Sequence, residues 1–230
     1  MSSDKAQKDT WDPAVCYPDL DMSDGLAEAL KRGACRLGPT LDRLVDGSGR
    51  AELATSRGTV LINVALWERR FFIDIYESGI EWASGATDDL EQTLRAVVAW
   101  RAGVSLDDYV VQFPFMREGT LARAFVEGRV AEAHWEELLA SEYPTGGQRL
   151  LVRLAPFGEL RGLYPEISYG EIRFTESPPR LGDRVFRVER DGEAFRVTVR
   201  EAGPDPETRE YVLDGLDEVA RHIVGFFAAG

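Results

Sequence analysis

The sequence contains little of the chemistry on which metal and disulfide sites depend. Among its 230 residues there are only two cysteines, Cys16 and Cys35, and two histidines. Two cysteines are too few for a disulfide scaffold. His134 has Glu137 on the same expected helix face, but one such pair leaves a metal ion short of ligands, and no Cys-x-x-Cys is present. The sequence therefore predicts no metal site and no cofactor.

Basic side chains are outnumbered by acidic ones. There are 27 Lys and Arg residues against 40 Asp and Glu residues, which gives a formal net charge of -13 at pH 7. A nucleic-acid surface depends on clustered Lys and Arg, so we do not expect nucleic acid as a partner. The acidity fits general solubility, and it also fits a basic protein partner.

Long apolar runs are absent as well. A helix that crosses a bilayer needs roughly 18 or more apolar residues in succession, and the sequence has no such run. Residues 1–10 are polar and lack the apolar core of a signal peptide. We therefore expect a cytoplasmic protein that has no membrane partner.

Common catalytic motifs are also missing. The sequence has no G-x-G-x-x-G or G-x-x-x-x-G-K-[ST] phosphate loop and no G-x-S-x-G nucleophile turn. His222 follows Arg221 on an expected helix surface, where a solvated histidine is the ordinary interpretation. His134 and Arg173 are the weak catalytic candidates that are left. The sequence favours a protein without catalysis of its own and leaves an enzyme open.

What the sequence does contain is an internal repeat. A strand at residues 71–79 and a helix at 88–100 are followed, in the same order, by a strand at 195–203 and a helix at 214–226. Aligning the two strands also aligns the preceding strands without a gap. In the helices, His222 then falls on Ala96. We interpret this pattern as a duplication.

The duplication predicts an α+β fold made of two halves. Each half is expected to contain a helix, four antiparallel strands and a second helix, because alternating apolar residues follow a capped helix in both places. The expected boundaries are an N-terminal extension at 1–22, a first half at 23–104, a helical connector at 105–145 and a second half at 146–230. We expect the extension to be ordered only if its aromatic side chains occupy a groove.

Several aromatic and arginine side chains are not obviously required by a core. They are Trp67, Arg69, Arg70, Trp82, Arg161, Tyr164, Tyr169 and Arg173. Aromatic and arginine residues often anchor protein interfaces, so we consider these the candidate binding residues. The structural alternative is that each tryptophan shields a neighbouring side chain and each arginine pairs with one of the abundant acids.

Three motifs carry a family resemblance. They are Trp100-Arg-Ala-Gly-Val-Ser-Leu106, Phe113-Pro-Phe115 and the segment from Leu160 to Phe174. Over residues 86–230 the chain resembles an uncharacterised actinobacterial family, a domain of unknown function labelled natural-product biosynthesis protein. The family often has histidine where Tyr169 stands here. The resemblance implies a bacterial pathway gene and carries over no active site.

These observations lead to three hypotheses. The first is an accessory protein of a natural-product pathway that binds a peptide or a protein from the same gene cluster, with a chaperone-like architecture. The second is an enzyme that modifies a metabolite or a ribosomal peptide, and the third is an acidic immunity-type protein. The oligomeric state is not fixed by the sequence. We expect function to reside where the repeats differ, at residues 67–70 against 191–194 and at 164–173 against 45–54.

Overall fold

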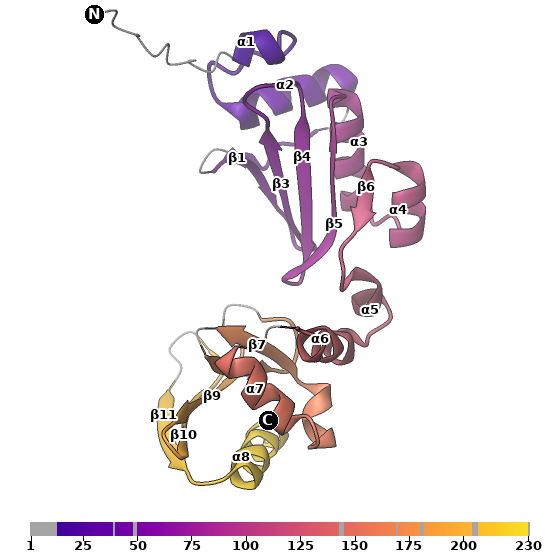
Figure 1. Cartoon of the computed structure of the whole chain (residues 1–230). Coiled ribbons are helices and arrows are strands. Elements are labelled where there is room, and N and C mark those ends of the chain that lie inside the picture. Colours follow the sequence, from indigo (N-terminus) through magenta and orange to yellow (C-terminus); the bar gives the residue numbers. More distant parts are fainter. Residues whose placement is uncertain are drawn as a thin grey trace, which may run out of the picture. The chain divides into compact units, whose positions relative to one another are not determined.

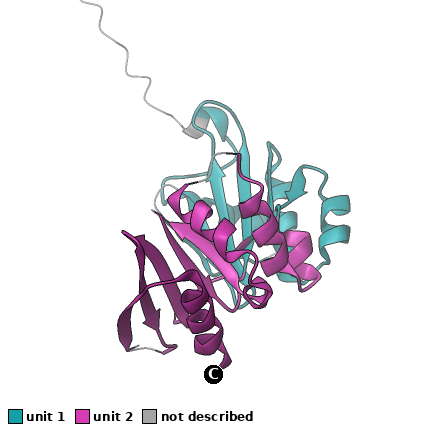
Figure 2. Cartoon of the chain, turned by 60° about the horizontal axis from the view of Figure 1, so that its bottom comes forward, with its two compact units in different colours: residues 1–77, 81–120 teal, residues 78–80, 121–230 magenta. Residues whose placement is uncertain are grey.

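The computed structural model describes residues 13–229, except residues 39, 48–49, 143–144, 169, 180–181 and 204–206. The chain forms two compact units, one of residues 1–77 and 81–120 and one of residues 78–80 and 121–230 (Figure 2). Each unit contains one antiparallel sheet with helices packed against it. The α+β class predicted from the sequence is confirmed.

The first unit is built on a six-stranded sheet in the order β1-β2-β3-β4-β5-β6 (Figure 1). The strands are β1 (Leu44–Asp46), β2 (Ala51–Ala54), β3 (Gly58–Val64), β4 (Phe71–Glu77), β5 (Ile80–Thr87) and β6 (Met116–Glu118). The helices are α1 (Pro13–Cys16), α2 (Leu26–Leu37), α3 (Leu90–Arg101) and α4 (Leu106–Gln112).

Alternation in β3 and β4 gives the first unit its core. Val60 and Ile62 pair with Ile75 and Ile73 across the two strands, and all four side chains are fully buried. Successive side chains of a strand point to opposite faces, so these residues form one apolar face against which α2 and α3 pack. The strand faces read from the sequence are confirmed here.

The second unit is built on a five-stranded sheet in the order β7-β8-β9-β10-β11. The strands are β7 (Tyr164–Ser168), β8 (Glu171–Thr175), β9 (Val185–Asp191), β10 (Ala194–Arg200) and β11 (Thr208–Leu213). The helices are α5 (Ala122–Val126), α6 (Val130–Leu139), α7 (Gly146–Leu154), the short 3-10 helix η1 (Gly158–Gly162) and α8 (Leu216–Ala228). Its core includes Trp135, Phe174 and Phe186.

Each half has five strands between its helices, so the prediction of four strands was wrong. The additional strands are β1 and β7. Both lie at a sheet edge and pair with one neighbour only, and Pro165 interrupts the pattern of β7. Period-two alternation is difficult to recognise over three to five residues. The meander of five sequential strands followed by a helix is common to both halves.

The segment expected as a helical connector, 105–145, is not one structural element. It contains α4, α5 and α6, but also the strand β6, which pairs with β5. The boundary between the two compact units falls inside this segment, between Thr120 and Leu121. Its N-terminal part therefore belongs to the first unit and its C-terminal part to the second.

An arginine connects α3, the helix that follows the five-strand meander of the first unit, to the sheet. The Arg57 guanidinium lies 2.8 Å from the Glu77 carboxylate and donates to the Trp100 carbonyl at 2.6 Å. It also lies 5.0 Å from the centre of the Trp82 ring and 5.2 Å from that of Trp100. Charged hydrogen bonds and cation–π contacts thus act together near the C-terminal end of α3.

The same arrangement recurs in the second unit. Arg184 pairs with Glu201 at 3.2 Å and donates to the carbonyl oxygen of Phe226 in α8. Its guanidinium lies 4.5 Å from the Phe226 ring centre. We call Arg57 and Arg184, with their carboxylate and carbonyl partners, the arginine anchors. They support the duplication independently of the apolar pattern, because core packing does not require a charged group at this place.

The N-terminal extension is anchored by Tyr17, which is fully buried. Its hydroxyl accepts from the Arg70 backbone N–H at 3.0 Å and lies within 3.1 Å of the carbonyl oxygens of Ala65, Glu68 and Arg70. The turn between β3 and β4 thus forms the site that an aromatic side chain of the extension was expected to occupy. Residues 1–12, with Trp11, lie outside the described residues.

Candidate functional site

The two units differ in how the helix after the five-strand meander, α3 or α8, packs on the sheet. In the first unit Ala96 and Trp100 of α3 are fully buried, and so is Trp82 of β5 at 1% exposure. In the second unit β11 is exposed from Thr208 to Val212. A meander of the same topology thus has a closed edge in one unit and an open one in the other.

The strand registers identify what has changed. The turn Ser78-Gly79 has positive φ at both residues, which is typical of a two-residue type I′ hairpin, and it places Trp82 opposite Ile75. In the second unit the residue opposite Val199 is Arg209. Because β10 is the counterpart of β4, Arg209 stands where the first unit has a large apolar side chain.

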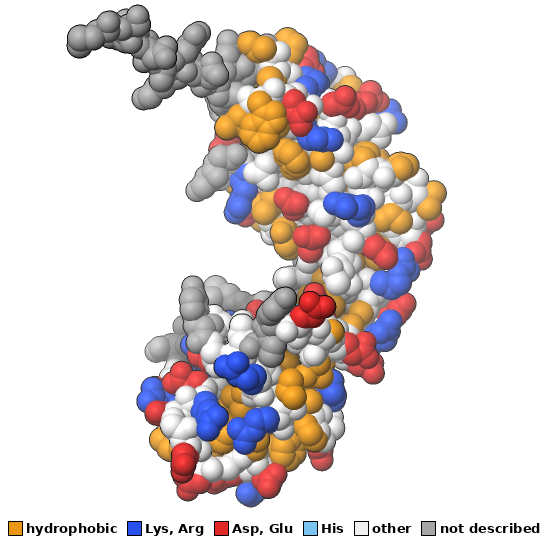
Figure 3. Space-filling model, viewed as in Figure 1, with side chains coloured by type: hydrophobic (Ala, Val, Ile, Leu, Met, Phe, Trp, Pro, Cys, Tyr) orange, Lys and Arg blue, Asp and Glu red, His pale blue; other side chains and the backbone are white. Residues whose placement is uncertain are grey.

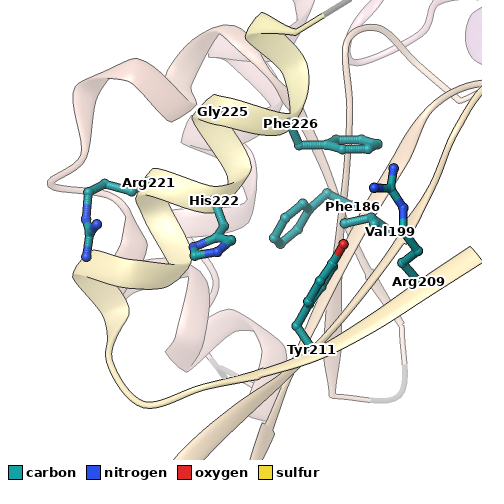
Figure 4. Close-up of a pocket in the computed structure, with 8 residues that line it drawn as sticks. All are labelled: Phe186, Val199, Arg209, Tyr211, Arg221, His222, Gly225 and Phe226. Atoms are coloured by element: carbon teal, nitrogen blue, oxygen red, sulfur yellow. The ribbon is translucent and has the colours of Figure 1, made fainter.

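A pocket of about 370 Å³ lies beside this position, between α8 and the sheet (Figure 4). We call it the α8 pocket. Its lining residues are Phe186, Val199, Arg209, Tyr211, Arg221, His222, Gly225 and Phe226. The rings of Phe186, Tyr211 and Phe226 point towards one another across the space, and the Tyr211 hydroxyl points into it (Figure 4). The inner wall is apolar and aromatic.

Polar groups lie around this apolar wall. Arg209 pairs at 2.8 Å with Glu201, a carboxylate that it shares with Arg184. The Nδ1 of His222 lies 2.9 Å from the carbonyl oxygen of Glu218 and donates a hydrogen bond to it in the tautomer that carries the proton on Nδ1. This contact leaves Nε2 available for others. Arg221 has no carboxylate partner within the described ranges. Arg221 therefore keeps an unpaired charge beside the pocket, with its side chain directed away from the three rings (Figure 4).

The lining of the α8 pocket carries few side chains that could act in catalysis. It has one tyrosine hydroxyl and one imidazole, with ring centres 6.5 Å apart, and contains no serine, cysteine or carboxylate. In the described part of the chain no three His, Cys, Asp or Glu side chains come together to hold a metal ion. An apolar cavity with a few polar groups at its mouth is the usual form of a binding site.

The binding candidates of the first unit are dispersed. Trp67 is 79% exposed at the turn between β3 and β4, whereas Trp82 is a core residue and presents no surface to a partner. Arg69 forms a two-pronged ion pair with Asp19, 2.9 Å at one of the two contacts. Arg70 pairs with Glu68 at 3.2 Å. Each arginine thus has a local partner, as the structural alternative anticipated.

Three candidates of the second unit come together with two acids. The rings of His134 and Tyr164 are stacked, with centres 4.4 Å apart and an interplanar angle of 8°. His134 lies 3.4 Å from Glu137, and Arg173 lies 3.1 Å from Glu166. Burial, assisted by both carboxylates, raises the pKa of Tyr164 to about 12, so its hydroxyl is neutral at pH 7. His134 and Arg173 are engaged in stacking and pairing in this group.

The remaining two candidates lie nearby in the sequence. The Arg161 guanidinium lies 4.8 Å from the ring centre of Trp135, whose indole N–H donates to the Leu163 carbonyl at 2.9 Å. Arg161 therefore covers a core tryptophan. Tyr169, the position at which the family resemblance has histidine, lies outside the described residues.

The sequence analysis singled out none of the α8 pocket residues as a binding residue. One signal was present, because the repeat aligns His222 with the fully buried Ala96. A polar side chain in place of a buried small one means that the helix cannot pack in the same way. The position of Arg209 opposite Val199 needed the strand register, which the sequence does not supply.

The surface and the helices add two observations. Acidic and basic side chains are interspersed on the visible surface of each unit rather than gathered in one patch (Figure 3). None of the helices in the described part of the chain is long and apolar enough to cross a bilayer.

No family model, no curated protein and no solved structure matches this chain. The family resemblance of residues 86–230 stays a prediction, and the case for function depends on the geometry of the α8 pocket.

Proposed function

We propose that the protein is an accessory protein of a bacterial natural-product pathway, which works in the cytoplasm and binds a peptide or protein partner without a cofactor of its own. The observation that carries the proposal is the α8 pocket, an apolar cavity that opens in one unit at the place where the other unit is closed by core side chains. The pathway assignment follows from the family resemblance.

The size and lining of the pocket support a side chain as the bound group. About 370 Å³ is near the lower end of the range for small-molecule sites, and three aromatic rings surround it. Apolar burial supplies on the order of 25 cal/mol per Å² removed from water, so one large side chain in this pocket can contribute much of a binding free energy.

The polar groups support a peptide over a purely apolar ligand. Arg221 at the rim lacks a carboxylate partner among the described residues, and Nε2 of His222 is not used by the contact with Glu218. A peptide supplies both an apolar side chain and nearby polar groups that can pair with them. Such groups fix orientation and specificity more than affinity.

The test uses the purified proteins encoded by the neighbouring genes and 12-residue peptides tiled across them, with binding measured by calorimetry. Gly225→Phe is the informative variant, because Gly225 lines the pocket and a Cβ atom added there meets no atom within 4 Å, so the new side chain starts without a clash. We expect this variant to fill the pocket and weaken binding at least tenfold, with the helix intact by circular dichroism.

Gly158→Phe is the matched control. A Cβ atom added at Gly158 also meets no atom within 4 Å, and Gly158 does not line the α8 pocket. It should bind as the unmodified protein does. Absence of binding by every peptide and protein tested, or equal affinity of Gly225→Phe and Gly158→Phe, would refute the proposal.

A further inference from the structure

The outer edge of β5 in the first unit is covered by a strand of the same chain. β6 pairs antiparallel with β5, with Ala83 opposite Glu118 and Gly85 opposite Met116. The Gly119 N–H then donates to the Trp82 carbonyl at 3.1 Å. Residues 82–85 of this edge are thereby covered and are not available to another chain.

The segment that supplies β6 also supplies side chains to the core. Tyr109 lies edge-on against Trp82, with ring centres 4.9 Å apart, and Phe113 lies 5.0 Å from Tyr109. All three are buried, as is Met116. Residues 105–119 therefore close the first unit in two ways, by adding a strand and by placing apolar side chains beside it.

In the second unit, the outer strand edge and the cavity beside it are both left open within the described residues. β11 is an end strand of its sheet, and within the described ranges no strand pairs with its outer edge (Figure 1). The α8 pocket lies on the inner face of the same strand, with Arg209 and Tyr211 among its lining residues. An unpaired edge and an apolar pocket on one strand are the two features that strand-addition sites use.

We propose that β11 accepts an extended segment of the partner protein as an added antiparallel strand, and that one aromatic or large aliphatic side chain of this segment fills the α8 pocket. This inference rests on the proposed function and specifies its binding mode. In the first unit, residues 105–119 of the same chain add the strand and the apolar side chains. In the second unit, we expect a segment of another molecule to do the same.

Charge defines the partner segment further. Residues i and i+2 of a strand share a face, so an acidic residue two positions from the anchor lies on the side of α8, where Arg221 is unpaired within the described residues. On the opposite face β11 presents Glu210, which favours a basic residue next to the anchor. The segment we expect is extended, with an apolar anchor, an acid on the same face and a base on the other.

The test uses the tightest peptide from the calorimetric screen, synthesised in two N-methylated series. In an added strand only alternate residues direct their N–H groups to the neighbouring strand. Methylation of one alternate set should lower the affinity at least tenfold, and methylation of the other set should change it less than about twofold. Bound peptide should also slow hydrogen exchange of β11 amides and leave those of the opposite edge strand, β7, unchanged.

The possible outcomes separate the two proposals. If no peptide binds, the proposed function fails. If a peptide binds and Gly225→Phe weakens it, but both methylated series behave alike and β11 amides are not protected, the binding site stands and strand addition is refuted. Strand addition from a partner is also refuted if the free protein is a dimer by light scattering with its β11 amides already protected at the concentrations used.

Discussion

The arginine anchors lead to a quantitative prediction about the two units. Replacement of Arg57 by methionine keeps the aliphatic stem but removes the ion pair with Glu77, the hydrogen bond to the Trp100 carbonyl and two cation–π contacts. A hydrogen bond to a charged group is worth about 1.5–3 kcal/mol and each cation–π contact about 0.5–1 kcal/mol. We expect Arg57→Met to lower the free energy of unfolding by about 3 kcal/mol, part of which comes from the unpaired Glu77.

The same replacement of Arg184 should cost less, because Glu201 keeps a second partner. Arg209 lies 2.8 Å from Glu201, so this carboxylate stays paired when Arg184 is replaced. We expect a loss of about 2 kcal/mol for Arg184→Met. In an Arg209→Met background Glu201 would have neither partner, and the cost of Arg184→Met should rise by about 1 kcal/mol.

Native-state hydrogen exchange monitors the two units separately. Amides of α3 report Arg57→Met and amides of α8 report Arg184→Met, and urea denaturation gives the free energies. The reasoning is wrong if Arg57→Met costs no more than Arg184→Met, or if the cost of Arg184→Met is the same with and without Arg209. If the α3 amides were equally protected in Arg57→Met and in the unmodified protein, Arg57 would not stabilise the packing of α3 on the sheet.

Three further predictions concern single side chains. Trp67→Ala should change the free energy of unfolding by less than about 0.5 kcal/mol, because the side chain is 79% exposed, whereas Trp82→Ala should lower it by about 3–5 kcal/mol, because that side chain is 1% exposed. Urea denaturation measures both, and similar losses would contradict the difference in burial. Tyr17→Phe should cost about 2 kcal/mol, because two hydrogen bonds of a buried hydroxyl are lost; an unchanged urea midpoint would contradict this. Tyr164 should ionise near pH 12, which is measured as the part of the tyrosinate absorbance that Tyr164→Phe lacks. Because the pKa of Tyr164 in the folded protein exceeds the unfolded value of about 10, its contribution to stability should fall as the pH rises from about 10 to 12. Ionisation of Tyr164 near pH 10 would refute the prediction.

The parts of the fold that the sequence predicted are those with a long periodic signal. β3 and β4 each alternate over seven residues, and their buried faces follow directly from that alternation. β1 has three residues and β7 contains a proline, so neither gives a readable period. Whether a segment this short becomes a strand depends on the neighbour with which it pairs.

The arginine anchors and the α8 pocket could not be read from the sequence for a different reason. Arg57 and Arg184 do not align in the ungapped match of the strands, because an arginine is long enough to reach the same carbonyl from a different backbone position. Among the candidate residues, Trp67 and Trp82 each have one acidic and one apolar residue next to them in the sequence, but Trp67 is exposed and Trp82 is buried. Tertiary packing distinguishes them, and a single sequence does not record it.

The meander topology has a consequence for how the chain folds. From β1 to β5 and from β7 to β11 every strand pairs with the strand next to it in the sequence, so each pairing closes only a short loop. Loop-closure entropy is small for such contacts, and chains rich in them fold faster than β proteins with distant pairings. The main exception is β6, which reaches back past α3 and α4 to β5. We therefore expect the added strand of the first unit to form late, after the sheet that it completes.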